Sequence, residues 1–156
     1  FDKKNSFHRV LWDHAIDPKS KGFIKLKKSN KIKKVILCSG KVYFDLLEAR
    51  EKLQKDDVVL YRIEQLYPFP AKSLVKELKP YVESAKFFWC QEEPKNMGAW
   101  NTVRNYIDRT LEIIEFKKTK VKYIGRNASS TTATGNYNKH LAEQKKILEK
   151  VVRKPN

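Results

Sequence analysis

Ser39, Gly40 and Lys41 form the first group of residues whose types and spacing could bind a ligand. They separate an apolar run, 35–38, from a segment with apolar residues at helical spacing. A strand, a tight turn and a helix start bring backbone N–H groups and the positive end of the helix dipole to one point, where an anion can bind. The same residues also suit a structural role, in which Gly40 makes the turn and Ser39 caps the helix. Both interpretations stay open.

A second group of polar residues follows the apolar run at 87–90. The sequence predicts a buried strand over this run and a loop directly after it, which carries Glu92 and Glu93. Ligands of open α/β sheets bind at the carboxyl ends of strands. Glu92, Glu93, Lys95 and Asn96 are therefore expected at a functional edge of the domain.

Arg62 stands near the end of another apolar run, 58–63. An arginine is seldom buried without a partner. The sequence predicts that its partner is a carboxylate, from Glu64, Glu92 or Glu93, or else the anion of a ligand.

The three histidines and two cysteines form no pattern of a catalytic or metal site. His8, His14 and His140 have no Ser, Cys or acid at a recognisable catalytic spacing. Cys38 and Cys90 lie in apolar runs without a partner at metal-ligand spacing, so we expect two buried, reduced thiols. No apolar run reaches the roughly 20 residues of a membrane span, and no signal-peptide pattern is present.

An alternation of strands and helices must position these groups. Helical patterns follow each of the apolar runs, and Pro68 and Pro70 make a rigid connection before the second helix. Such an alternation predicts a mostly parallel sheet with helices on both faces. The predicted interior strands are 35–38, 58–63, 86–90 and 120–125.

The two ends of the chain give weaker patterns. Residues 22–28 alternate weakly and predict a short edge strand, whose lysines would discourage the addition of a further strand. Asn136 is expected to cap the last helix, with Leu141, Leu148 and Val152 facing inward.

The chain is strongly basic, with 34 Lys+Arg against 18 Asp+Glu and a net charge of +16. Such a charge is typical of nucleic-acid-binding proteins. However, base readout needs Arg, Asn or Gln interleaved with aromatic residues on one element, and the sequence shows no such element. A lysine-rich solvated surface is the preferred interpretation, and a basic module that binds nucleic acid or another anion is the alternative.

Several longer motifs follow one another along the chain. These are Phe7, Arg9 and Val10; residues 37–46; residues 62–70; residues 89–94 with Asn96 and 98–100; and Tyr123, Gly125-Arg126, Ala128-Ser129, Thr134-Gly135 and His140. Together they resemble the E1 component of 2-oxoglutarate dehydrogenase, over nearly the whole chain and in the same order.

The resemblance implies a C-terminal domain of the transketolase type. Its fold is α/β, in three α/β/α layers, with a mostly parallel five-stranded sheet and one antiparallel edge strand. Residues 1–33 are expected to form a connecting segment with the edge strand, and residues 34–156 the α/β domain.

The family decarboxylates 2-oxoglutarate with thiamine diphosphate and Mg²⁺ in the tricarboxylic acid cycle. It transfers the succinyl group to the lipoyl group of the E2 dihydrolipoyl succinyltransferase, in a complex that also contains E3. The cofactor motif of the family, Gly-Asp-Gly followed later by Asn, is missing here. The resemblance therefore implies cofactors bound outside this chain, no catalytic or metal-binding residue within it, and no activity of the chain alone.

The resemblance also implies homodimer assembly, and acetyl-CoA as a regulator in some relatives, with no nucleic-acid or membrane partner. The expected compartment is the bacterial cytoplasm, or the mitochondrial matrix in a eukaryote. The related 2-oxoadipate dehydrogenase E1 is an alternative. The implied regulatory anion or acyl-CoA site consists of Ser39, Lys41, Arg62 and Arg126. Glu92 and Glu93 are expected as structural carboxylates that pair with the two arginines.

Overall fold

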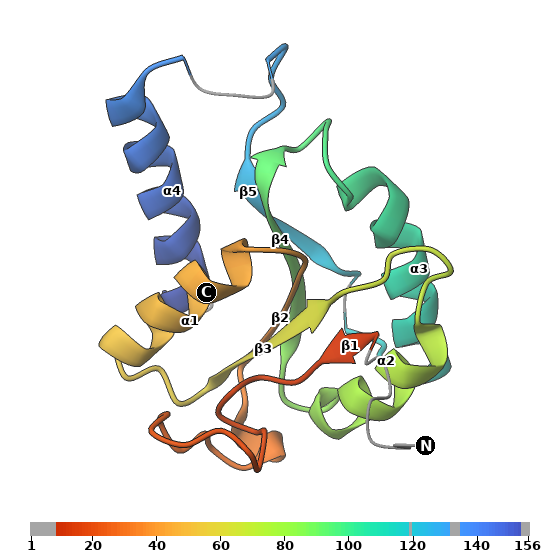
Figure 1. The fold of residues 1–156 in the computed structure, drawn as a ribbon. Helices are drawn as coiled ribbons and strands as arrows, with labels where there is room; N and C mark the ends of the chain where they lie inside the picture. Colours follow the sequence, from red (N-terminus) through yellow and green to blue (C-terminus); the bar gives the residue numbers. More distant parts are fainter. Residues whose placement is uncertain (1–8, 119, 132–134, 154–156) are drawn as a thin grey trace, which may run out of the picture.

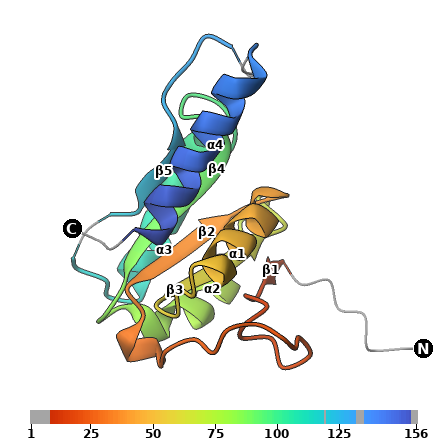
Figure 2. The same ribbon diagram turned by 90° about the vertical axis from the view of Figure 1, so that its left-hand side faces the viewer.

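The computed structural model describes residues 9–118, 120–131 and 135–153 of the chain. They form a five-stranded sheet in the order β1-β3-β2-β4-β5 with helices on both faces (Figure 1, Figure 2). The β1–β3 pair is antiparallel and the other pairs are parallel, which confirms the predicted fold class. The strands are β1 (Val10–Leu11), β2 (Lys34–Cys38), β3 (Val58–Ile63), β4 (Lys86–Pro94) and β5 (Lys122–Arg126).

Alternate residues of the central strands build two separate cores. The side chains of Leu37, Tyr61 and Trp89 pack under α2 and α3, whereas those of Ile36 and Leu60 pack under α1 and α4. This two-residue period is what a strand covered on both faces requires. The helices are α1 (Val42–Lys52), α2 (Ala71–Leu78), α3 (Trp100–Ile113) and α4 (Tyr137–Val152), with short 3-10 helices η1 (Ser29–Lys31) and η2 (Lys79–Tyr81). Within the described ranges, no helix has the length and apolar character needed to cross a membrane.

The antiparallel edge strand lies earlier in the chain than predicted. It is formed by Val10 and Leu11, which pair with Ile63 and Arg62, and not by residues 22–28. β1 occupies the outer edge of β3, so residues 22–28 cannot pair with that strand. Their backbone groups bind elsewhere, as where the N–H of Lys27 donates to a carbonyl oxygen before β3.

The strand β4 continues through the residues predicted to form a loop. Pro94 lies opposite Arg126 of β5, and the N–H of Lys95 donates to the carbonyl oxygen of Arg126 at 3.1 Å. The register shifts between Cys90 and Pro94, as at a β-bulge. Glu92 and Glu93 therefore lie in the irregular end of a strand, and the loop prediction is wrong because the pairing that extends β4 comes from a distant segment.

The start of α1 differs from the predicted cap. Gly40 adopts a φ of +75° and makes the turn, as expected. The N-cap residue is Lys41, with no side-chain capping hydrogen bond, so the prediction that Ser39 caps this helix is wrong. The positive φ of Gly40 places one more residue in the turn and moves the helix start beyond Ser39.

The last helix begins as predicted, and two of the three residues predicted to face inward do so, because Val152 is buried and Leu148 packs against the core. Asn136 caps it, because its side-chain oxygen accepts hydrogen bonds from the N–H groups of residues 138 and 139. Ile147 and Val151 are buried, whereas Leu141 is 48% exposed and does not face inward. At about 100° per residue, Leu141 stands about 120° around the helix from the buried Ile147.

Lys34 joins the first parallel strand to the end of the last helix. Its Nζ donates to the carbonyl oxygens of Lys150 (2.8 Å), Val151 (3.1 Å) and Arg153 (2.5 Å). These carbonyls have no amide partner in the helix, so a buried ammonium group caps α4 from the sheet.

Candidate functional site

The carboxyl ends of β2, β3 and β4 bring several predicted site residues to one edge. Cys38 of β2 lies opposite Arg62 of β3 and opposite Cys90 of β4. Ser39 and Gly40 therefore leave the sheet between the end of β3 and the polar end of β4. The chain runs from β2 through α1 to one side and from β4 through α3 to the other. In open α/β sheets such a switch point is where ligands bind.

A cavity of about 500 Å³ opens at this switch point. Its walls include Ser39 and Gly40 after β2, Gln91 and Glu93 on β4, and Thr102 in the first turn of α3. Glu93 is exposed, so its carboxylate can meet a ligand there. Lys41 is exposed next to the turn.

Gln91 organises the floor of this cavity. Its Oε1 accepts hydrogen bonds from the indole Nε1–H of Trp89 at 2.9 Å and from the backbone N–H of Trp100 at 3.0 Å. Its Nε2 donates to the carbonyl oxygens of Glu93, Pro94 and Met97 at 3.3, 3.1 and 2.7 Å. Because the side chain is only 3% exposed, these bonds tie β4, the following loop and α3 together away from water.

Arg62 lies between a carboxylate and two aromatic rings. Its Nε forms an ion pair with Oε1 of Glu64 at 2.5 Å. Its guanidinium carbon stands 5.4 Å from the ring centre of Tyr43 and 5.1 Å from that of Phe44. These contacts account for a partly buried arginine and confirm Glu64 as one of its predicted partners.

The structure gives Glu92 and Glu93 hydrogen-bond partners other than the two arginines with which they were expected to pair. Glu92 accepts a hydrogen bond from Gln144 of α4 at 3.2 Å, and the same amide donates to Asp45 of α1 at 3.0 Å. The carbonyl oxygen of Glu93 accepts from the hydroxyl of Tyr123 at 3.2 Å. Glu92 thus joins β4 to the two helices on one face of the sheet.

Arg126 lies on the edge strand β5, across β2 and β4 from Arg62 on β3. It pairs with Glu143 of α4 at 2.8 Å. The strand order places β2 and β4 between β3 and β5, so three strand spacings, about 14 Å, separate the two arginines. The four residues of the implied anion site are therefore divided: Ser39, Lys41 and Arg62 lie near one another, and Arg126 lies beyond β4.

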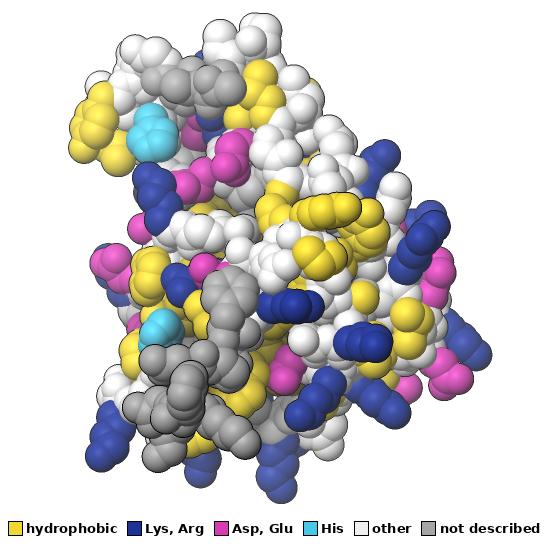
Figure 3. Space-filling model, turned by 45° about the vertical axis from the view of Figure 1, so that its right-hand side comes forward, with side chains coloured by type: hydrophobic (Ala, Val, Ile, Leu, Met, Phe, Trp, Pro, Cys, Tyr) yellow, Lys and Arg dark blue, Asp and Glu magenta, His cyan; other side chains and the backbone are white. Residues whose placement is uncertain are grey.

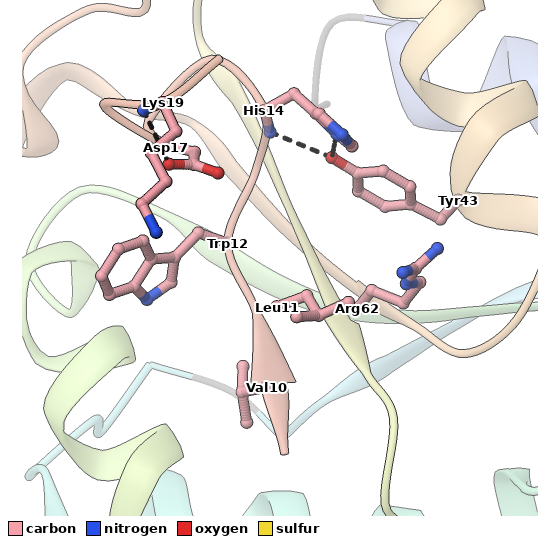
Figure 4. Close-up of a pocket in the computed structure, with 8 residues that line it drawn as sticks. All are labelled: Val10, Leu11, Trp12, His14, Asp17, Lys19, Tyr43 and Arg62. Carbon is pink, nitrogen blue, oxygen red and sulfur yellow. Dashed lines mark hydrogen bonds between the residues drawn. The ribbon is translucent and has the colours of Figure 1, made fainter. Parts of the chain in front are cut away.

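A third region, beside β1, was not predicted as a site (Figure 4). A cavity of about 220 Å³ lies between the N-terminal segment, β3 and α1. Figure 4 shows His14, Tyr43 and Arg62 on one side of the strand and Trp12 and Lys19 on the other. An indole, two cationic groups and an imidazole can together hold a flat or anionic ligand.

His14 contacts the Tyr43 hydroxyl through both its backbone and its ring. Its backbone N–H donates to the Tyr43 hydroxyl at 3.0 Å, and its Nδ1 forms a hydrogen bond of 2.6 Å with the same oxygen, in which the donor depends on the imidazole tautomer. Burial raises the pKa of Tyr43 to about 12, so the phenol keeps its proton near neutral pH. His14 thus has a hydrogen-bond partner 29 residues away, which local spacing does not indicate.

Comparison with known proteins identifies the family. A sequence model described as 2-oxoglutarate dehydrogenase C-terminal matches residues 1–152. The chain belongs to this family. Among similar proteins, the 2-oxoglutarate dehydrogenase E1 component of Brucella abortus (strain S19) is 54% identical over 146 residues, and those of Brucella anthropi and Brucella ovis are 53% identical over 146 residues. The alignments cover 94% of this chain and 14% of each relative, so the chain spans about one seventh of their length.

Among the described residues, no three His, Cys, Asp or Glu side chains gather where they could hold a metal ion. Cys38 and Cys90 are free and buried, as predicted. Burial raises the pKa of the Cys38 thiol and raises that of Cys90 to about 12, so neither is a thiolate near neutral pH.

The positive charge of this family member is dispersed on the face that Figure 3 shows. Lys and Arg side chains stand at separate points there, with Asp and Glu among them (Figure 3). This distribution agrees with the preferred interpretation of a lysine-rich solvated surface.

Gln91 is the main functional-site residue that sequence reasoning missed. It belongs to a family motif, but its five hydrogen bonds depend on chain segments on both sides of it. A polar amide directly after a buried apolar run, with Trp89 two residues before it, is the one signal that could have indicated it.

Proposed function

We propose that this chain is the C-terminal domain of a 2-oxoglutarate dehydrogenase E1 component and acts as part of that enzyme. The observation that carries the proposal is the 54% identity to the Brucella abortus E1 component over 94% of the chain. In this proposal the whole protein decarboxylates 2-oxoglutarate in the cytoplasm of a bacterium. It passes the succinyl group to the lipoyl group of E2 and works with E3. Thiamine diphosphate and Mg²⁺ supply the decarboxylation chemistry from sites outside this chain.

The role proposed for the domain is to support homodimer assembly. Exposed aromatic side chains between β3 and α3 support this role, because such groups are typical of contact surfaces. Tyr67 is 88% exposed and Tyr106 is 42% exposed. The ring of Phe69 stacks on that of Tyr106, with ring centres 5.2 Å apart. A second copy of the enzyme chain is the proposed occupant of this surface.

A regulatory role is also proposed, in which acetyl-CoA or another anion binds beside the switch point. Ser39, Lys41 and Arg62 are the proposed contacts, with Arg126 reached only by an extended ligand. The exposed ammonium group of Lys41 and the partly exposed guanidinium of Arg62 support this proposal, because phosphate groups bind to such cations.

A chimeric enzyme tests the proposal. The corresponding C-terminal region of the Brucella abortus E1 component is replaced by this chain, and decarboxylation is measured with 2-oxoglutarate, thiamine diphosphate, Mg²⁺, E2 and E3. We expect the chimera to be a dimer and to be active on 2-oxoglutarate, and this chain alone to be inactive. A folded, dimeric chimera without activity, or carbon dioxide release by the chain alone, contradicts the proposal. A parallel assay with 2-oxoadipate tests the related enzyme.

The proposed binding of acetyl-CoA is tested separately, with a control variant that removes the same charge elsewhere. Acetyl-CoA is added to the chimera, to its Lys41→Ala/Arg62→Ala variant and to a Lys145→Ala/Arg104→Ala variant, which removes the same charge from exposed helix positions. Activation that is lost only in the first variant supports the site. Activation that both variants lose equally, or no activation, contradicts it.

A further inference from the structure

A polar cavity of about 350 Å³ lies between β5, the loop after it and α4. Figure 1 and Figure 2 show α4 running alongside β5, and the described residues of the loop are 127–131 and 135–136. The volume is in the range of about 300–1,000 Å³ typical of small-molecule sites. The cavity is lined by Gly125, Arg126, Asn127, Ala128, Ser129, Thr131, Gly135, Lys139, Glu143, Lys146, Ile147 and Lys150.

One face of α4 supplies most of the charge in this cavity. Lys139, Glu143, Lys146 and Lys150 follow one another at steps of three or four residues, so they lie on the same side of the helix. All four line the cavity. The helix therefore presents three ammonium groups and one carboxylate to it.

The carboxylate is already engaged. Glu143 pairs with Arg126 at 2.8 Å, and both side chains are largely buried. The opposite charges of this pair cancel. The cavity wall therefore keeps an excess of three positive charges, from Lys139, Lys146 and Lys150. Lysines concentrated in a concave surface attract anions more strongly than the same lysines dispersed on a convex surface.

The opposite wall is held in place and carries hydroxyl groups. The Asn96 side chain donates to the carbonyl oxygen of Ser129 at 2.9 Å and accepts from the N–H of Ser129 at 2.9 Å. This two-bond contact fixes the start of the loop on the end of β4. The hydroxyls of Ser129 and Thr131, which lie 3.4 Å apart, and the open space at Gly135 make this wall suitable for phosphate oxygens.

The N–H groups at the start of α4 do not make this site. Asn136 accepts hydrogen bonds from two of them. The site is built instead from the side chains of the helix face and of the loop.

We propose that this cavity binds a ligand that carries several linked phosphates, such as the polyphosphate group of a nucleotide. The lysines are spread over about 16 Å of helix, at about 1.5 Å per residue. A single phosphate can meet few of these ammonium groups, whereas a chain of phosphates can meet all of them. The inference goes beyond the proposed function. It shares Arg126 with the regulatory anion site, but it rests on α4 and the loop after β5.

The test is a calorimetric titration of inorganic tripolyphosphate into the complete chain, at about 0.15 M salt. A Lys139→Gln/Lys146→Gln variant is compared with a Lys72→Gln/Lys76→Gln variant. The control pair removes the same charge from exposed positions of α2, on the other face of the sheet. We expect saturable binding, weakened roughly tenfold or more in the first variant and little changed in the second.

Three results would overturn the inference. An equal loss in both variants would show that only the net charge of the chain matters. An absence of saturable binding to the unmodified chain would remove the site. Binding that is lost in a Lys41→Ala/Arg62→Ala variant, but kept in the α4 variant, would place the phosphates at the switch point. Circular dichroism of each variant confirms that the folded state is compared.

Discussion

Arg50 of α1 forms an ion pair with Asp13 of the N-terminal segment, and neither side chain has any exposed surface (0% and 0%). The Asp13 carboxylate also accepts hydrogen bonds from the N–H groups of Leu60 at 2.8 Å and Ala15 at 2.9 Å. Asp13 therefore holds the segment after β1 against both α1 and the interior of β3. The cavity beside β1 depends on this attachment, because His14 is the next residue.

Replacing Asp13 with Ala should destabilise the domain strongly. The change leaves a buried guanidinium group without its main partner, and breaking a buried pair in this way costs about 3–5 kcal/mol. The free energy of unfolding from urea titration measures the effect. Asp17→Ala, which removes one exposed hydrogen bond to the N–H of Lys19, is the control and should cost much less. Equal losses in the two variants would mean that the Asp13–Arg50 pair is not important for stability.

Replacing Gln91 with Leu should disturb β4 and the start of α3 together. Leucine has a similar size but leaves the indole N–H of Trp89 and the N–H of Trp100 buried without an acceptor. Each such loss costs about 1–3 kcal/mol, so we expect a total of about 2–6 kcal/mol. Urea unfolding followed by tryptophan fluorescence measures it. Gln65→Leu, at a position where the amide makes an exposed hydrogen bond, should change stability little.

Replacing Gly125 with Ala should destabilise the sheet by about 1–3 kcal/mol, the usual cost of overpacking. An added Cβ at Gly125 would lie 2.6 Å from Cζ of Tyr123 and 2.8 Å from the carbonyl oxygen of Gln91. Gly135→Ala is the matched control, because nothing lies within 4 Å of a Cβ built there. Thermal unfolding of the two variants gives the comparison. A Gly125→Ala variant as stable as the Gly135→Ala variant would show that the two strands can separate slightly at no cost.

Stability should fall in alkaline solution. Burial raises the pKa of Cys90 from 9.0 to about 12 and that of Tyr43 from 10.0 to about 12. Below about pH 8 both groups keep their protons whether the chain is folded or unfolded. At higher pH, up to about 12, the unfolded chain releases protons that the folded chain retains, so the free energy of unfolding decreases with pH. Each group contributes about 1.4 kcal/mol per pH unit where only its unfolded form has titrated.

Urea titrations at several values from about pH 8 to about pH 11 test this pH dependence. The Cys90→Ala variant should show a shallower decrease just above pH 9, where the thiol is the first of the two groups to titrate when unfolded. A free energy of unfolding that stays constant across this interval would contradict the predicted burial of both groups.

The alternation of strands and helices was predictable because apolar residues recur along each central strand or helix at the spacing typical of that element. The two faces of β2 and the apolar stripe of α3 are visible in the sequence alone. The position of β1 was not, because a strand of two residues has no period to detect. The extension of β4 was missed for a different reason. It depends on pairing with Arg126, and nothing near Gln91 in the sequence indicates that partner.

The candidate site was predictable only in part. The turn at Gly40 and the pairing of Arg62 with Glu64 are local and were found. The contacts of His14 with Tyr43 and of Arg126 with Glu143 join segments far apart in the chain. Local spacing carries no information about such pairs, so the division of the implied anion site between the ends of β3 and β5 became visible only in the structure.

The contact between Lys34 and the end of α4 has a consequence for the order of events during synthesis. Its acceptor groups lie 116 to 119 residues after the lysine. While the chain emerges from the ribosome, the sheet can begin to form around β2, but its Lys34 ammonium group cannot reach those acceptors until the last helix has been made. Contacts of such long sequence separation form slowly. The final turn of α4 thus completes the contacts of a strand that was synthesised 116 residues earlier.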